Sequence, residues 1–228
     1  MERKKNQQSV KVGLLSLGDL LKNSFEIYKK NSHTFISLMA LHAVAFLVFL
    51  PAALLFIIPR SHFYKLVLFA LLLIVFAIAM LIIGLWVQVS LLFAIKNRNS
   101  KVNLQKSLRQ GWEHITAYIW VTLLVGLVVF GGILLFIIPG IIFSIWFSFS
   151  KYVFVAEGKE STKALIKSKE LVMGNWWGIF GRILVVTLLA SLISYIPFLG
   201  PLINFFFMVP FIQIYLYLLY EDLRKKKA

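Results

Sequence analysis

The chain has 228 residues, of which 60% are hydrophobic and 14% charged, and its mean hydropathy is +0.86. A soluble domain could not bury so much apolar surface, so the composition excludes that class and indicates an integral membrane protein. Cysteine is absent, which excludes disulfides, thiolate metal sites and a cysteine nucleophile. The net charge of +15 does not indicate nucleic-acid binding, because anionic lipid headgroups attract lysine and arginine near a membrane by about 1 kcal/mol each.

The first predicted unit spans residues 14–95. It opens with an amphipathic helix, continues as an apolar run over 35–58, turns at Pro59 and returns as an apolar run over 66–95. The apolar stripe of the amphipathic helix recurs every three or four residues, at Leu14, Leu17, Leu21, Phe25 and Tyr28. A helix lying in the headgroup plane, followed by two crossings of about 20 residues each, accounts for these lengths.

The second predicted unit, 102–156, repeats this order. Its amphipathic helix carries the stripe Leu104, Leu108, Gly111, Trp112 and Ile115. The apolar run that follows, 117–155, is too long for one crossing, and Pro139-Gly140 divides it.

The third predicted unit spans residues 161–220. Ser161 or Thr162 is placed to cap its amphipathic helix, and Gly174 is placed to end that helix. Its apolar run over 178–220 is divided at Pro197.

Two recurring sequences support three copies of one unit. Leu-Leu-Phe-Ile-Ile-Pro occurs at 54–59 and again at 134–139. A Leu-x-x-Ser pattern lies upstream of the apolar part of each unit, at 21–24, 104–107 and 165–168. We therefore predict an all-α integral membrane protein, a single domain over 1–228, with six transmembrane helices in three units of amphipathic interfacial helix plus transmembrane hairpin. The units could pack around a pseudo-threefold axis along the membrane normal, or as a sequential bundle with no central axis.

Positive charge predicts the orientation. Only Arg60 and Lys65 fall on one side of the predicted membrane, and all other lysines and arginines fall on the opposite side. By the positive-inside rule the basic side is cytoplasmic. Both termini, with the basic tails 1–13 and 221–228, are expected in the cytoplasm, in a multi-pass protein of the cell membrane.

The acidic residues do not indicate catalysis. All nine carboxylates lie outside the predicted crossings. An intramembrane protease would need paired aspartates or a His-Glu-x-x-His helix, and neither occurs in the sequence. We expect a protein that is not an enzyme and that uses no cofactor or metal.

Few polar side chains lie within the predicted crossings. Four of them are candidates for an intramembrane polar path, with hydrogen bonding between helices as the alternative: His42, Gln88, Asn204 and Gln213. Three lysines on the third amphipathic helix are expected to contact anionic headgroups on the cytoplasmic face: Lys163, Lys167 and Lys169.

One stretch carries a family resemblance. Its recurring positions are Pro139, Gly140, Glu157, Gly158, Ala164, Ser168, Gly174 and Trp177. The order Ile-Pro-Gly, Glu-Gly, Ala-Leu-x-x-Ser and Gly-x-x-Trp resembles bacterial multi-pass membrane families, namely the membrane domain of some glycerophosphoryl diester phosphodiesterases and the YciC-like membrane proteins. The resemblance implies a multi-pass membrane module. It does not imply phosphodiesterase activity, because the catalytic barrel of those enzymes and its metal-binding carboxylates have no counterpart in this chain.

Two functions are compatible with this sequence. The first is a non-catalytic scaffold, or an accessory or regulatory component that associates with a membrane-protein partner. The alternative is a protein that handles or transports a lipid or another amphiphile. If the protein handles a lipid, we expect Gln88, Asn204 and Gln213 to face one cavity. If it is a scaffold, we expect function to be most sensitive to substitutions on the interfacial helices.

Overall fold

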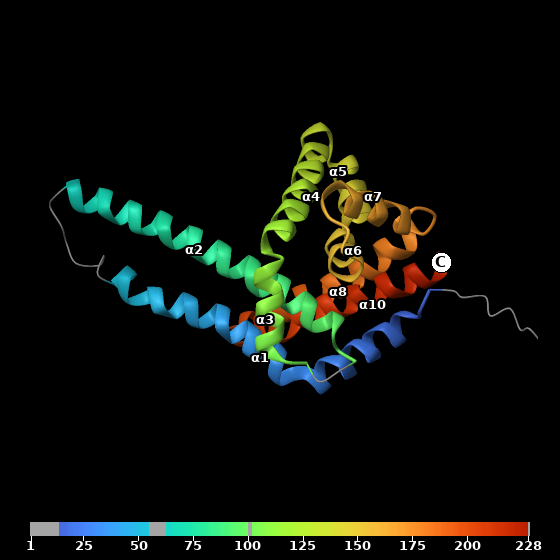
Figure 1. Cartoon of the computed structure of the whole chain (residues 1–228), viewed down its shortest axis with the longest axis horizontal. Helices are drawn as coiled ribbons and strands as arrows, with labels where there is room; N and C mark the ends of the chain where they lie inside the picture. Colours follow the sequence, from blue (N-terminus) through green and yellow to red (C-terminus); the bar gives the residue numbers. More distant parts are fainter. Residues whose placement is uncertain (1–13, 55–62, 100–101, 228) are drawn as a thin grey trace, which may run out of the picture.

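The computed structural model describes residues 14–54, 63–99 and 102–227, and every regular element in this part of the chain is helical (Figure 1). In chain order the elements are α1 (Leu17–Leu54), α2 (Phe63–Lys96), α3 (Leu104–Glu113), α4 (Ile115–Leu135), α5 (Ile137–Phe147), α6 (Ser150–Glu157), α7 (Ser161–Val172), α8 (Trp176–Ser194), α9 (Leu199–Ile203), the π-helical turn η1 (Asn204–Met208) and α10 (Val209–Lys226).

The described residues contain five stretches that are long and apolar enough to cross a membrane: Ala70–Lys96, Ile115–Leu135, Ile137–Glu157, Trp176–Ser194 and Leu199–Lys226. These helices are those of a multi-span membrane protein, as the composition predicts. The expected first crossing, 35–58, is helical up to Leu54. The end of that crossing, together with Pro59, Arg60 and the tail 1–13, lies outside the described residues.

The hairpins project in different directions from a common base. Figure 1 shows α1 and α2 side by side as one long hairpin, whereas α4 and α5 form a second hairpin that points elsewhere. At the base, α10 packs against α1, α2 and α7. The hairpins therefore meet at one end and spread apart at the other.

The buried core lies at this common base. The C-terminal parts of α2 and α10, and the stretch around α6, supply many of its large side chains: Leu91, Leu92, Ile95, Phe149, Tyr152, Tyr215 and Tyr220. Away from the base the apolar side chains are exposed, as at Leu134–Ile138 and Leu71–Val75. Lipid chains can cover such a surface at no hydrophobic cost, so it is the surface expected of a membrane protein.

Hydrogen bonds join the two ends of the described chain. The Leu15 amide donates to Asp222 Oδ2 at 2.7 Å, and Arg182 Nη2 donates to the Leu15 carbonyl at 2.9 Å. Nearby, Arg98 Nη2 lies 2.5 Å from Glu221 Oε2 and holds the end of α2 against α10. The predicted basic tail 221–228 is helical through Lys226. Its two acidic residues, Glu221 and Asp222, bond to other elements at the base.

Short helices precede long ones at three points. The backbone of α1 is non-helical at Asn31, and His114 separates α3 from α4. Helix α7 ends before Gly174, whose φ of +85° only glycine adopts without strain. The α7 cap differs from the expected one. Glu160 occupies the N-cap, and Ser161 is the first helical residue.

Candidate functional site

The resemblance motif begins at the α4–α5 hairpin. Helix α4 stops at an extended Phe136, three residues before Pro139, so the turn lies earlier than the sequence predicts. Pro139 sits in the first turn of α5, where its missing amide hydrogen costs nothing. Gly140 is buried against α4: a Cβ there would lie 3.0 Å from the Ile133 amide nitrogen. The glycine thus permits the two helices to approach closely.

Glu157 and Gly158 end α6 at the base. Gly158 is the C-cap, with φ +66°, the left-handed conformation that glycine favours. Glu157 Oε1 accepts a hydrogen bond from the Tyr220 hydroxyl at 2.7 Å, and Glu157 also pairs with Lys159 and Arg224. This carboxylate therefore connects α6 to α10.

Ser168 of α7 reaches into the backbone of another helix. Its Oγ donates to the Trp146 carbonyl at 2.7 Å and accepts from the Phe149 amide at 3.1 Å. These backbone groups flank the interruption between α5 and α6, and an inserted side chain of this kind interrupts the helical hydrogen-bond ladder. Ser168 and its neighbour Ala164 are fully buried. The serines at the two equivalent Leu-x-x-Ser positions, Ser24 and Ser107, are also buried.

We expect Ser168→Ala to destabilise the protein by about 1–3 kcal/mol, because it leaves the buried Phe149 amide and the partly buried Trp146 carbonyl without this partner. Thermal unfolding in detergent would measure the loss. Ser191→Ala is the matched control, since Ser191 Oγ bonds only to the Thr187 carbonyl on an exposed part of α8. Equal shifts in unfolding temperature for both variants would contradict the role of Ser168.

The lysines of α7 differ in their surroundings. Lys163 is exposed, Lys167 pairs with Glu170 at 3.3 Å, and Lys169 Nζ lies 4.5 Å from the ring centroid of Trp146. The end of α7 is capped by Lys227, which directly follows α10 and whose Nζ donates to the carbonyls of Glu170 and Met173. Burial, reinforced by the charge of Lys167, lowers the pKa of Lys227.

The start of α8 carries an aromatic group. Trp177 is 77% exposed, as suits a side chain at a membrane interface, and Trp176 stacks on Phe180 with centroids 5.2 Å apart. With Gly174 and Met173 these tryptophans line a shallow pocket against α5.

The four candidate polar-path residues are not all together. Among the described residues, His42 and Gln88 line one cavity, whose lining includes neither Asn204 nor Gln213. Gln213 accepts a hydrogen bond from the Tyr152 hydroxyl at 2.7 Å in the core, and Asn204 donates to the Ala190 carbonyl at 3.1 Å and to Ser194 Oγ. These two amides therefore join helices.

The cavity with His42 and Gln88 has a volume of about 410 Å³ and lies between α1, α2, α4 and the start of α10. Gly84 provides room for the His42 ring: a Cβ at this glycine would lie 3.0 Å from His42 Cε1. On the other side, the π-helical turn η1 places the Phe205 ring edge-on to His42, with centroids 5.7 Å apart. A π-helical turn is uncommon, and many occur at functional sites.

A second cavity of about 320 Å³ adjoins the first, because both are lined by Gln88, Tyr118 and Thr122. It leads toward the base, where its lining includes Ser148, Ser150 and Lys151. Sequence reasoning did not single out Ser150 or Lys151. Lys151 was counted with the cytoplasmic charges, although the apolar run continuing beyond it to Val155 was a signal that it lies within a spanning helix.

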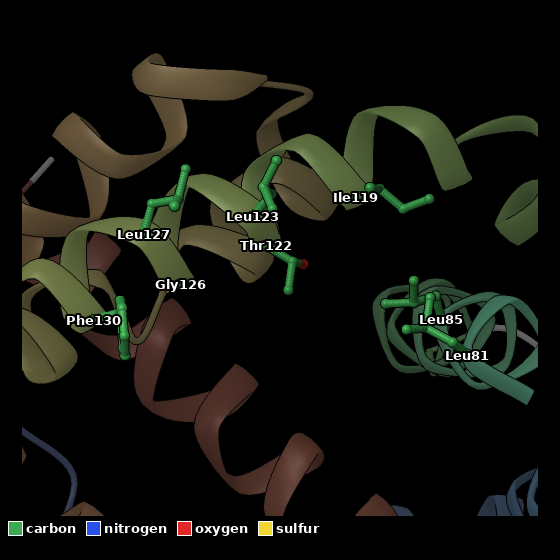
Figure 2. Close-up of a pocket in the computed structure, with 8 residues that line it drawn as sticks. All are labelled: Leu81, Leu85, Ile119, Thr122, Leu123, Gly126, Leu127 and Phe130. Carbon is green, nitrogen blue, oxygen red and sulfur yellow. The ribbon is translucent and has the colours of Figure 1, made fainter. Parts of the chain in front are cut away.

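An apolar groove of about 490 Å³ lies between α2 and α4 and shares lining residues with both polar cavities. Figure 2 shows its walls, with Leu81 and Leu85 on α2 facing side chains of α4. Thr122 points into the space between the two helices, and it lines the groove and both cavities. We refer to the three neighbouring cavities, which share Thr122 as a lining residue, as the inter-hairpin site. It is basic and polar toward the base and apolar between α2 and α4.

Within the described residues, no three histidines or carboxylates are grouped as a metal site would require. The chain that builds the inter-hairpin site is a helical protein with several apolar spans. Comparisons with protein-family models, with curated proteins and with solved structures find no match to it.

Proposed function

We propose that this protein binds a membrane lipid or a similar amphiphile in the inter-hairpin site. The observation that supports the proposal most is the polarity gradient of this site, from Lys151, Ser150 and Gln88 to the leucines of the α2–α4 groove. An amphiphile has the same gradient, and binding pockets for such molecules combine an apolar wall with a few placed polar groups.

The proposed topology explains how an amphiphile would enter. We propose six crossings in three same-sense units, a short amphipathic helix and a hairpin in each, within the cell membrane and with both termini cytoplasmic. The three interruptions at Asn31, His114 and Gly174, each between a short helical segment and a long one, support this repeat. Hairpins that diverge from one base leave lateral openings through which a lipid chain could enter from the bilayer.

The proposed role is non-catalytic. Among the described carboxylates, those at the base bond to neighbouring helices: Glu157 to Tyr220, Glu221 to Arg98, and Asp222 to the Leu15 amide. These contacts are structural. The scaffold or accessory function stays a prediction, because it requires a partner surface, and the described chain offers a pocket of definite chemistry instead.

Gly126→Phe tests the proposal. Gly126 lines the groove, and a Cβ there would meet nothing within 4 Å, so the ring can enter the groove without displacing the backbone. We expect the wild type to retain phospholipid through detergent exchange and the variant to retain severalfold less, as counted by native mass spectrometry.

Gly131→Phe is the matched control, since it lies on the same helix, its Cβ also meets nothing within 4 Å, and it does not line the groove. Equal lipid retention in both variants and the wild type would contradict binding in the groove. A second polypeptide retained in fixed proportion, without lipid, would favour the accessory function.

A further inference from the structure

Lys151 is a cation that has no counter-ion among the described residues. It lies within the candidate span Ile137–Glu157 and is partly buried. None of the five ion pairs in the described part of the chain includes it. Its Nζ lies instead 5.2 Å from the ring centroid of Tyr152, which is uncharged. Ionisable residues within spanning helices are costly, and for that reason they commonly mark a binding site or pathway.

Ser150, next to Lys151, has an unused hydrogen-bonding group. The residue is 1% exposed, and its buried Oγ forms no hydrogen bond with any described residue. A buried hydroxyl without a partner costs free energy, so such a group in a cavity wall suggests that a bound molecule supplies the partner. Ser150 and Lys151 line the same cavity, at its end nearest the base.

The interruption between α5 and α6 determines where Ser150 and Lys151 lie. Ser168 binds the Trp146 carbonyl and the Phe149 amide, and α6 restarts at Ser150 directly after this point. These hydrogen bonds from Ser168 of α7 hold the backbone just before Ser150, so contacts within the protein fix the position of Lys151. Gln88 and Tyr118 add polar side chains on the opposite walls of the cavity.

The groove and the lysine together specify the ligand. The α2–α4 groove offers leucines and a phenylalanine to an acyl chain, and Lys151 offers an unpaired positive charge at the other end of the same site. The chain as a whole is strongly basic, with 24 lysines and arginines against nine carboxylates, which favours the approach of anionic molecules.

We infer that the inter-hairpin site selects lipids with an anionic headgroup, which Lys151 pairs with and Ser150 hydrogen-bonds, while the acyl chain lies between α2 and α4. The inference rests on the proposed function, because it names the class of lipid that the same site takes. The recognition is charge-assisted hydrogen bonding of a phosphate-type or carboxylate-type oxygen, which exceeds neutral bonding in strength.

The test is a competition between headgroups. Delipidated full-length protein in detergent is mixed with equal amounts of phosphatidylglycerol and phosphatidylcholine of identical acyl chains, and native mass spectrometry measures the ratio of the two bound forms. We expect about a tenfold preference for phosphatidylglycerol in the wild type. Lys151→Gln should bring the ratio close to one, Ser150→Ala should reduce it less, and Lys151→Arg should keep it.

Lys106→Gln is the control, because it removes the same charge from an exposed position on α3. A preference unchanged in Lys151→Gln, or lost equally in Lys106→Gln, would overturn the inference and assign Lys151 to the general positive charge of the surface. Binding of both lipids by the wild type without preference would also overturn it while leaving the proposed function standing. No binding of either lipid would refute the proposed function itself.

Inorganic phosphate distinguishes a lipid headgroup from a free anion. We expect an excess of phosphate to leave the bound phosphatidylglycerol in place, since the acyl chain contributes to its binding. Displacement of the lipid by phosphate alone would show that the site takes a free anion, and would overturn the lipid assignment.

Discussion

Replacing Gly140 by valine should destabilise the α4–α5 hairpin more than any surface change. A Cβ at Gly140 would lie 3.0 Å from the Ile133 amide nitrogen and 3.1 Å from Ile133 Cα, and backbone atoms cannot move aside as a flexible side chain can. The contact is equally tight from the side of α4, because a Cβ at Gly132 would lie 3.1 Å from Gly140 Cα. We expect a loss of at least about 1–3 kcal/mol, with separation of the two helices.

The matched control is Gly131→Val, which makes the same substitution on α4 at a position where a Cβ meets nothing within 4 Å. Thermal unfolding in detergent, followed by circular dichroism, would compare the two. The close approach at Gly140 would be contradicted if both variants unfolded at the same temperature.

A second large effect is expected at Gly111→Val, where α3 lies against α2. A Cβ there would lie 3.0 Å from Ser90 Cα and would overlap with Ser90 Oγ, and Ser90 is fully buried. One turn away, the Trp86 indole nitrogen donates to the Leu108 carbonyl at 2.8 Å, so moving α3 also breaks this hydrogen bond. We expect a loss of about 1–3 kcal/mol and a red shift of tryptophan emission as Trp86 becomes more exposed to solvent.

The control for this prediction is Gly181→Val on α8, where a Cβ also meets nothing within 4 Å. An unchanged emission maximum in Gly111→Val, together with wild-type stability, would show that α3 does not need to lie so close to α2.

Composition and the length of the apolar runs were enough to predict a multi-span helical protein, because both signals are local and summed over many residues. The helix end at Gly174 was also predictable, and this glycine adopts a left-handed conformation just beyond the end of α7. The turn before α5 was misplaced, because proline is compatible with the first turn of a helix and does not by itself mark the turn that precedes it.

Features that depend on distant parts of the chain were not predictable. The interruption between α5 and α6 exists because Ser168, on another helix, supplies the missing hydrogen bonds, and nothing in the local sequence Phe147–Ser150 shows this. Gln213 and Gln88 are both isolated amides within predicted crossings, so the sequence does not distinguish them. Only the fold shows that Gln213 is hydrogen-bonded by Tyr152. The relationship to bacterial membrane families, the threefold repeat and the orientation of the termini stay predictions.

Electron cryomicroscopy of the protein in nanodiscs of its own membrane lipids would test lipid binding in the inter-hairpin site most directly. We predict an elongated density between α2 and α4, beside Leu85 and Thr122, that ends in a headgroup at hydrogen-bonding distance from Lys151 Nζ. A map in which α2 and α4 close upon each other, with side chains filling the space and no lipid density, would contradict the account.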